Sequence, residues 1–237
     1  MSASSTTSFS RVHQVLRPPS YLEIGVSAGE TLRLARCDSI GVDPTLNITS
    51  NVIVSKPRCF FYQMSSDRFF EEVDPTGLLG RPIDLAFLDG MHLSEFLLRD
   101  FINIERHCKH NSVIVLHDCL PTDVYIAERV SNRERRVRFS TRPGWWTGDV
   151  WKVPLALRKY RPELKICAFD AAPTGLVCVT ALNSDSTVLA DSYSKIASEF
   201  QSFDLLDYGL EQLFAQLDVQ STRQIFGAEQ IAQYFGL

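Results

Sequence analysis

The residues best suited to chemistry in this sequence are carboxylates that stand where apolar runs end. Asp43 and Asp89 each follow such a run directly, and Asp118 follows another one residue later. His92 lies three residues after Asp89. In an open parallel sheet, ligands bind beyond the carboxyl ends of the strands, so these side chains are expected to share one site. Carboxylates there accept ribose hydroxyls or bind a divalent cation, and an imidazole takes or gives a proton.

A turn that contains glycine follows the first apolar run. Its sequence is Glu23-Ile24-Gly25-Val26-Ser27-Ala28-Gly29. Its two glycines let the backbone turn tightly and let a ligand approach it closely. Asp43 lies twenty residues after Glu23, at the distance where a strand-end carboxylate accepts ribose hydroxyls. The turn and the acid together fit either a nicotinamide dinucleotide or S-adenosylmethionine.

Two residues of the turn region separate these cofactors. Ser27 and Glu30 stand where a dinucleotide fingerprint has its second and third glycines. The Glu30 carboxylate would also repel a pyrophosphate seated at this turn. S-adenosylmethionine carries no phosphate, and its sulfonium and ammonium groups are cationic. The sequence therefore favours S-adenosylmethionine over a nicotinamide cofactor.

Short apolar runs that alternate with helical periodicity position these residues. The runs span 21–26, 39–42, 59–64, 83–88 and 113–116. Between the last two, segment 93–110 has apolar residues spaced by three and four, which is typical of an amphipathic crossover helix. Apolar strands joined by helices imply a parallel sheet that is buried on both faces. The predicted fold class is α/β.

The remaining segments complete the predicted organisation. Residues 30–35 are expected to form a helix after the turn, 119–146 a loop, and 165–169 with 176–182 a hairpin. A further helix begins near Gly148, and 186–237 is helical, ending in a helix at 225–235. We divide the chain into a polar N-terminal segment (1–19), a cofactor-binding domain (20–184) and a C-terminal helical extension (185–237). The extension packs on the domain or at a homodimer interface.

The ordered set of motifs resembles that of the class I methyltransferases. The resemblance is carried by Glu23-x-Gly25-x-Ser27-x-Gly29, Asp43, Asp89-Gly90-x-His92 and His117-Asp118, and it is greatest to the bacterial group called methyltransferase family 24. It covers about residues 20 to 182. It implies a Rossmann-like fold whose seven-stranded, mostly parallel sheet closes with an antiparallel hairpin. The departure from the family pattern is Ser27, where many class I enzymes have glycine.

The resemblance also implies roles for individual residues. The methionine portion of S-adenosylmethionine would contact Glu23, Gly25, Ser27 and Gly29. Asp43 would bind the ribose, and Ser66 and Asp67 would contact the adenine. Asp89 would hold the methionine amino group or a metal. Each acid has a structural alternative, as a turn residue, a helix cap or a hydrogen-bonded group inside the sheet.

Some relatives bind a divalent cation with carboxylates after the fourth and fifth strands, here Asp89 and Asp118. Neighbouring strands lie about 5 Å apart, so both carboxylates can reach one ion. Oxygen ligands favour Mg²⁺, or Mn²⁺ if an imidazole joins them. Without a metal, His92 is the candidate general base. Because adjacent strand residues point to opposite faces, His117 is not expected to contact the same ligand as Asp118.

The net charge and the cysteine spacing limit the classes of binding partner that the sequence suggests. The net charge is −4, from 24 basic and 28 acidic residues, so we expect neither a nucleic-acid nor a membrane partner. Six cysteines lack metal-type spacing, and no signal peptide or membrane span is visible, which favours a cytoplasmic protein. The basic cluster at 129–138 is interpreted as a solvated segment, with anion binding as the alternative.

These observations predict an S-adenosylmethionine-dependent methyltransferase that modifies an oxygen of a small molecule, such as a sugar hydroxyl. Asp89, Asp118 and His92 would handle the proton or the metal. Two alternatives belong to other classes. One is a non-catalytic scaffold that keeps the fold, and the other is a nicotinamide-dependent oxidoreductase.

Overall fold

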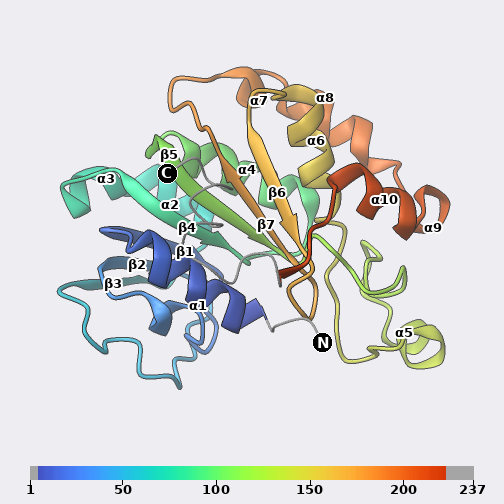
Figure 1. The fold of residues 1–237 in the computed structure, drawn as a ribbon, viewed down its shortest axis with the longest axis horizontal. Helices are drawn as coiled ribbons and strands as arrows, with labels where there is room; N and C mark the ends of the chain where they lie inside the picture. The colour runs from blue at the N-terminus through green and yellow to red at the C-terminus, as the bar shows by residue number, and fades with distance from the viewer. Residues whose placement is uncertain (1–4, 223–237) are drawn as a thin grey trace.

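The computed structural model describes residues 5–222 of the chain, and Figure 1 shows the arrangement of its elements. The strands are β1 (Ser20–Ile24), β2 (Asp38–Val42), β3 (Cys59–Tyr62), β4 (Ile83–Leu88), β5 (Cys108–His117), β6 (Lys165–Phe169) and β7 (Leu176–Thr180). The helices are α1 (Ser5–Leu16), the 3-10 helix η1 (Leu32–Leu34), α2 (Ser66–Glu72), α3 (Pro75–Leu79), α4 (Ser94–Glu105), α5 (Arg133–Phe139), α6 (Lys152–Tyr160), α7 (Val188–Asp191), α8 (Tyr193–Gln201), α9 (Leu205–Tyr208) and α10 (Leu210–Leu217).

The strands form one seven-stranded sheet in the order β3-β2-β1-β4-β5-β7-β6. Strands β1 to β5 pair in parallel, and β7 is antiparallel to both β5 and β6. The predicted α/β fold, with its closing hairpin, is therefore confirmed. The strand order reverses between β1 and β4, so the turns that follow these two strands define the switch point of the sheet.

Burial of the central strands explains why their sequences are largely apolar. Alternate side chains of β1, β4 and β5 enter two separate cores, one on each face of the sheet. The larger core packs against helices that include α2, α4, α6, α8 and α10. The smaller core packs against α1, whose Phe9 and Val12 are fully or almost fully buried. Figure 1 shows α1 in front of the sheet and α4 behind it.

Helix α1 was not predicted from the sequence, and it covers a face that a crossover helix was expected to share. Residues 30–35, predicted as a helix, contain only the single 3-10 turn η1, so this prediction was wrong. The connection from Ile24 to Asp38 is short, and much of it is taken up by the glycine-containing turn. The Phe9 ring instead packs 4.7 Å from the Phe87 ring of β4.

The described C-terminal helices α7 to α10 contribute buried side chains to the larger core. Within the segment predicted to be helical, α9 and α10 are separated at Gly209, whose φ of +90° interrupts the helix. The helix predicted at 225–235 lies outside the described residues. Within residues 5–222, no helix is both long and apolar enough to cross a lipid bilayer.

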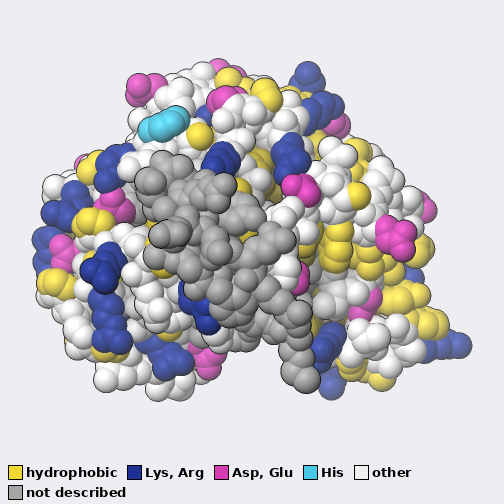
Figure 2. All heavy atoms as spheres, in the orientation of Figure 1, with side chains coloured by type: hydrophobic (Ala, Val, Ile, Leu, Met, Phe, Trp, Pro, Cys, Tyr) yellow, Lys and Arg dark blue, Asp and Glu magenta, His cyan; other side chains and the backbone are white. Residues whose placement is uncertain are grey.

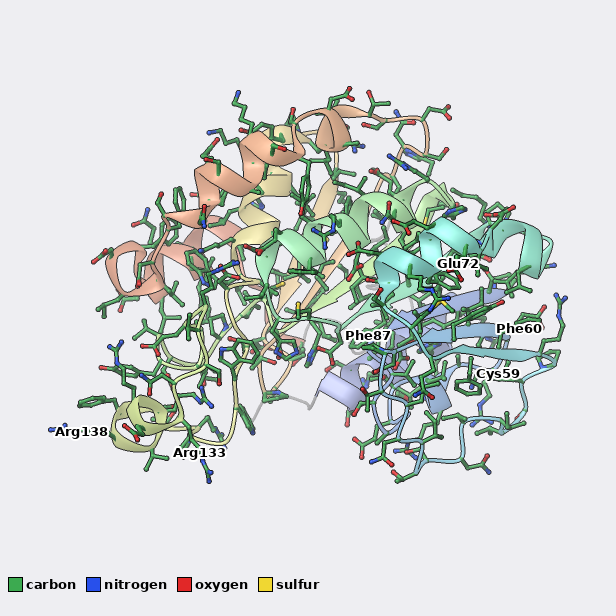
Figure 3. All side chains as sticks on the ribbon, turned by 180° about the vertical axis from the view of Figure 1, so that it is seen from behind. Cys59, Phe60, Glu72, Phe87, Arg133 and Arg138 are labelled. Atoms are coloured by element: carbon green, nitrogen blue, oxygen red, sulfur yellow. The ribbon has the colours of Figure 1, made fainter. Side chains whose placement is uncertain are left out.

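The basic segment is more ordered than the sequence suggested. It contains α5, which begins at the cap residue Asn132. Arg129 forms ion pairs with Glu95 (2.5 Å) and Asp149 (3.1 Å), and thereby ties the segment to the starts of α4 and α6. Arg133 and Arg138 point away from the body of the protein, as Figure 3 shows. The expectation of a merely solvated segment was therefore wrong for Arg129.

Candidate active site

A cavity of about 270 Å³ opens where the carboxyl ends of β1, β4 and β5 meet. Backbone and side chains of the glycine-containing turn form one wall, and the ends of β4 and β5 form another. Helix α1 contributes Phe9. The lining residues are Phe9, Gly25, Val26, Ser27, Ala28, Glu30, Thr31, Phe87, Asp89, His117, Pro173 and Leu176. The cavity therefore lies at the switch point, where this sheet topology binds its ligands.

The backbone of the glycine-containing turn adopts conformations that few side chains tolerate. Gly25 and Gly29 have φ values of +85° and +83°, and Ser27 has +47°. A Cβ on Gly25 would lie 1.9 Å from the carbonyl oxygen of Asp89, so the turns after β1 and β4 touch through their backbones. Gly25 is thus required by contact between two turns, in addition to any approach of a ligand.

We expect Gly25→Ala to destabilise the protein by about 2 kcal/mol or more, because a clash with backbone adds to the strain of a positive φ. Denaturant unfolding measures this change in the free energy of unfolding. Gly80→Ala, where φ is +71° but nothing lies within 4 Å, should show the strain alone. Gly144→Ala has neither problem and should be close to neutral. Equal costs at all three glycines would contradict the contact.

Glu23 lies beneath the turn and does not line the cavity. Its side chain is fully buried. One carboxyl oxygen accepts a hydrogen bond from the Tyr21 hydroxyl and the other from the Thr31 hydroxyl, each at 2.5 Å. Burial raises the pKa of Glu23 to about 8, although both hydrogen bonds act to lower it. The structure therefore gives Glu23 a supporting position under the turn, in place of the expected direct contact with methionine.

Asp43 ends β2 beside the turn. Its carboxylate accepts hydrogen bonds from the backbone N–H groups of Ser27 (2.8 Å) and Thr45 (2.7 Å). It thus holds the turn to the end of β2. Each carboxylate oxygen has a second lone pair, so this arrangement leaves acceptor capacity for ribose hydroxyls.

The residues expected near adenine lie at the start of α2, just beyond β3. Both oxygens of Asp67 accept from the Arg99 guanidinium, at 2.9 and 2.7 Å. Ser66 is the first residue of the helix, which Ser65 caps. Nearby, burial raises the pKa of Asp100 to about 7, although the Ser66 side chain acts to lower it. Neither Ser66 nor Asp67 lines the cavity, and both lie on its β3 side.

Two aspartates and two histidines form a compact cluster at the ends of β4 and β5. The Asp89 carboxylate lies 3.1 Å from His117 Nδ1 and 3.6 Å from His92 Nε2. The Asp118 carboxylate lies 3.3 Å from His117 Nδ1 and 3.4 Å from His92 Nδ1. The predicted set of Asp89, His92 and Asp118 is therefore brought together, and His117 joins it.

His117 belongs to this cluster although the sequence argument placed it on the opposite face from Asp118. The alternation of side chains holds only for extended backbone, and Asp118 has a φ of +60°. This left-handed residue turns its side chain back toward the face that His117 occupies. The Thr174 hydroxyl, which the sequence analysis did not identify, donates to the Asp118 carboxylate. The sequence alone did not reveal that Asp118 adopts a left-handed backbone conformation at the end of β5.

His92 is held from the far side by the segment before α6. Its Nδ1 lies 2.7 Å from the carbonyl oxygen of Trp146, and the two rings stack at 5.6 Å. Gly148 fits closely against the His92 backbone, since a Cβ there would lie 1.7 Å from the His92 carbonyl oxygen. The Asp149 carboxylate accepts from the backbone N–H of Ser94 at the start of α4. The 119–146 loop thus determines the position of His92.

The cluster strongly favours charged forms. Burial would lower the pKa values of His92 and His117, but the carboxylates of Asp89 and Asp118 outweigh it and raise both to about 9. Burial would raise the pKa of Asp89, but the two imidazoles hold it well below its usual range. For Asp118, burial prevails and the pKa is raised. At neutral pH, the two imidazoles are therefore protonated beside the ionised Asp89 carboxylate.

The same side chains fit a divalent cation. Single ligand atoms of Asp89, His92 and Asp118 all lie within 4.8 Å of one another. Two carboxylates and one imidazole suit Mn²⁺, whereas the carboxylates alone suit Mg²⁺. The carbonyl of Trp146 accepts from His92 Nδ1 if that atom carries the proton, an arrangement that leaves Nε2 free to ligate a metal. A cation would replace the protons that now balance the carboxylates.

Comparison with known proteins gives a family match over part of the chain. Residues 22–119, which include the turn, Asp43, Asp89 and Asp118, match the family model described as methyltransferase domain, of the family 24 group. No curated protein sequence matches the chain. The family resemblance predicted from the motifs is confirmed over this segment.

Solved structures show the same architecture. The methyltransferase PaMTH1 of Podospora anserina, with bound S-adenosylhomocysteine, superposes with a TM-score of 0.51 at 11% identity, covering 74% of this chain and 76% of that chain. The cofactor-bound protein Rv0187 from MTB superposes with a TM-score of 0.50 at 14% identity, covering 76% and 82%. At these identities, the likeness establishes a fold. That fold is the Rossmann-like class I methyltransferase fold.

Proposed function

We propose that this protein transfers a methyl group from S-adenosylmethionine to an oxygen atom of a small-molecule acceptor. The observation that carries the proposal is the cavity at the switch point of a methyltransferase fold, which the turn lines together with Asp89 and His117 of the strand-end cluster, while Asp43 holds the turn from beside it. Gly25, Ser27 and Gly29 would shape the wall around the methionine portion, and Asp89 would face its ammonium group. Asp43 would bind the ribose, with Ser66 and Asp67 on the adenine side.

The charges of the cavity support a cationic cofactor. Glu30, Asp89 and His117 all line it, and the His117 imidazolium offsets the charge of Asp89, so Glu30 supplies the excess negative charge. A carboxylate attracts a sulfonium or ammonium group and repels a phosphate. The turn of this chain therefore suits S-adenosylmethionine better than a dinucleotide, as its sequence had suggested.

The protonation of the cluster bears on how an acceptor hydroxyl loses its proton. A histidine whose pKa is about 9 is mostly protonated at neutral pH, which disfavours His92 as the general base in the metal-free cluster. We therefore propose that Asp89 and Asp118, joined by His92, hold Mg²⁺ or Mn²⁺. A cation bound there would lower the pKa of the acceptor hydroxyl. The chain's own part is to align that oxygen with the methyl group and to exclude water.

Binding of S-adenosylhomocysteine tests the cofactor assignment. We expect micromolar binding of the wild-type chain by calorimetry, corresponding to about −8 kcal/mol, and at least tenfold weaker binding by Asp43→Ala. The exposed Asp185→Ala is the matched control and should bind like the wild type. Unfolding midpoints of both variants show whether the fold is retained, since Asp43 also holds the turn. No binding by the wild-type chain, with or without Mg²⁺, would instead favour a scaffold that keeps only the fold.

A further inference from the structure

A second and larger hollow, of about 890 Å³, lies on the α1 face of the sheet and shares no described lining residue with the candidate active site. We call it the arginine groove. Its lining residues are Ser10, His13, Gln14, Arg17, Pro18, Arg33, Leu34, Arg36, Asn51 and Val54. The groove exists because η1 is too short to cover this face, so the end of α1, η1 and the loop before β3 enclose an open space. Its size falls in the range of small-molecule sites.

The groove concentrates positive charge. Arg17, Arg33 and Arg36 line it, and within residues 5–222 none of the three forms an ion pair with a carboxylate. Arg33 donates through Nε to the Glu30 carbonyl, and Arg36 donates through one amino group to Ser55. Most of the guanidinium donors therefore remain available. The described lining residues include no acid, and Figure 2 shows Lys and Arg side chains gathered at the left of this face.

A buried histidine also lines the groove. His13 is 93% buried, and its Nε2 has no hydrogen-bond partner among the described residues. Burial and the nearby Lys56 ammonium lower its pKa to about 3, so the imidazole is neutral. A buried polar atom without a partner costs stability. Because Nε2 is itself covered by protein, the donors open to a ligand in the groove are those of the exposed Arg33 and Arg36.

The remaining lining side chains suit an organic body attached to an anion. Pro18, Leu34 and Val54 provide apolar surface, while Gln14 and Asn51 provide amide donors and acceptors. Guanidinium groups recognise phosphate oxygens through paired hydrogen bonds. We propose that the arginine groove binds the phosphate groups of a phosphorylated small molecule of nucleotide size. The groove is separate from the methyl-donor cavity, and this proposal does not depend on the proposed function.

The experiment measures binding of ADP, inorganic pyrophosphate and adenosine to the full chain by calorimetry. We expect saturable binding of ADP and pyrophosphate, weaker at higher salt, and at least tenfold weaker binding of adenosine. The double variant Arg33→Gln/Arg36→Gln should weaken ADP binding about tenfold or more. Both side chains are exposed, so the fold should tolerate the changes.

The matched control is Arg138→Gln, on the distant helix α5, where the arginine points away from the protein (Figure 3). It should bind ADP like the wild type. Three results would overturn the proposal: absence of ADP binding at millimolar concentration, adenosine binding as tight as that of ADP, or equal loss of ADP binding in Arg138→Gln and in the double variant. The first two results would show that the groove does not recognise a phosphate group. The third would show that the net charge of the protein, and not the groove, determines ADP binding.

Discussion

Asp89→Asn is expected to weaken Mn²⁺ binding by about a hundredfold or more, because it removes a carboxylate from a site with two. Asp89 is also the carboxylate that lies nearest to His117, at 3.1 Å. The substitution should therefore move the pKa values of His117 and His92 down from about 9 toward that of an ordinary imidazole. Electron paramagnetic resonance of bound Mn²⁺ measures the first effect, and imidazole resonances in a pH titration measure the second.

The two readouts separate the metal from the cluster. Asp207→Asn, on the exposed surface of α9, changes net charge equally and should alter neither measurement. If the wild-type chain binds no Mn²⁺ while the histidine titrations shift as expected, the cluster is real and the cation proposal fails. If His92 and His117 titrate alike in the wild type and in Asp89→Asn, the Asp89 carboxylate does not raise their pKa values. The proposed charges of the cluster are then wrong.

Glu23→Gln is expected to stabilise the protein at alkaline pH. The pKa of Glu23 is about 8 in the folded chain against 4.5 for an ordinary glutamate, so the folded state holds the proton more tightly. The stability from this proton is complete below pH 4.5 and is lost as pH rises toward 8. A shift of this size corresponds to about 5 kcal/mol, as an upper bound. Glutamine keeps hydrogen-bonding atoms for Tyr21 and Thr31 without the buried charge.

Urea unfolding at pH 5 and pH 9 measures this effect. Other groups also titrate between these values, so the decisive quantity is the difference between variant and wild type at each pH. We expect a small difference at pH 5 and a gain of several kcal/mol for Glu23→Gln at pH 9. Glu72→Gln, an exposed glutamate in an i,i+4 ion pair with Arg68, should show little change between the two conditions. A pH-independent difference for Glu23→Gln would show that its carboxyl is ionised throughout.

Local patterns in the sequence determined the sheet and the residues at its edge. Runs such as 39–42 and 83–88 form most or all of β2 and β4, because a strand buried on both faces must be largely apolar. Parallel pairing then places the residue after each strand at one edge. This is why Asp89, His92 and Asp118 could be grouped before their distances were known.

Tertiary structure decided what local pattern cannot encode. His117 joins the cluster because Asp118 adopts a left-handed backbone conformation, which depends on what surrounds the strand end. Glu23 lies under the turn because Tyr21 and Thr31 enclose it. Phe9 lines the cavity because α1, which precedes β1 in the chain, packs over the sheet. That packing depends on contact between the apolar side of α1 and the smaller core. Each of these outcomes depends on contacts between distant segments, and those contacts exist only once the chain has folded.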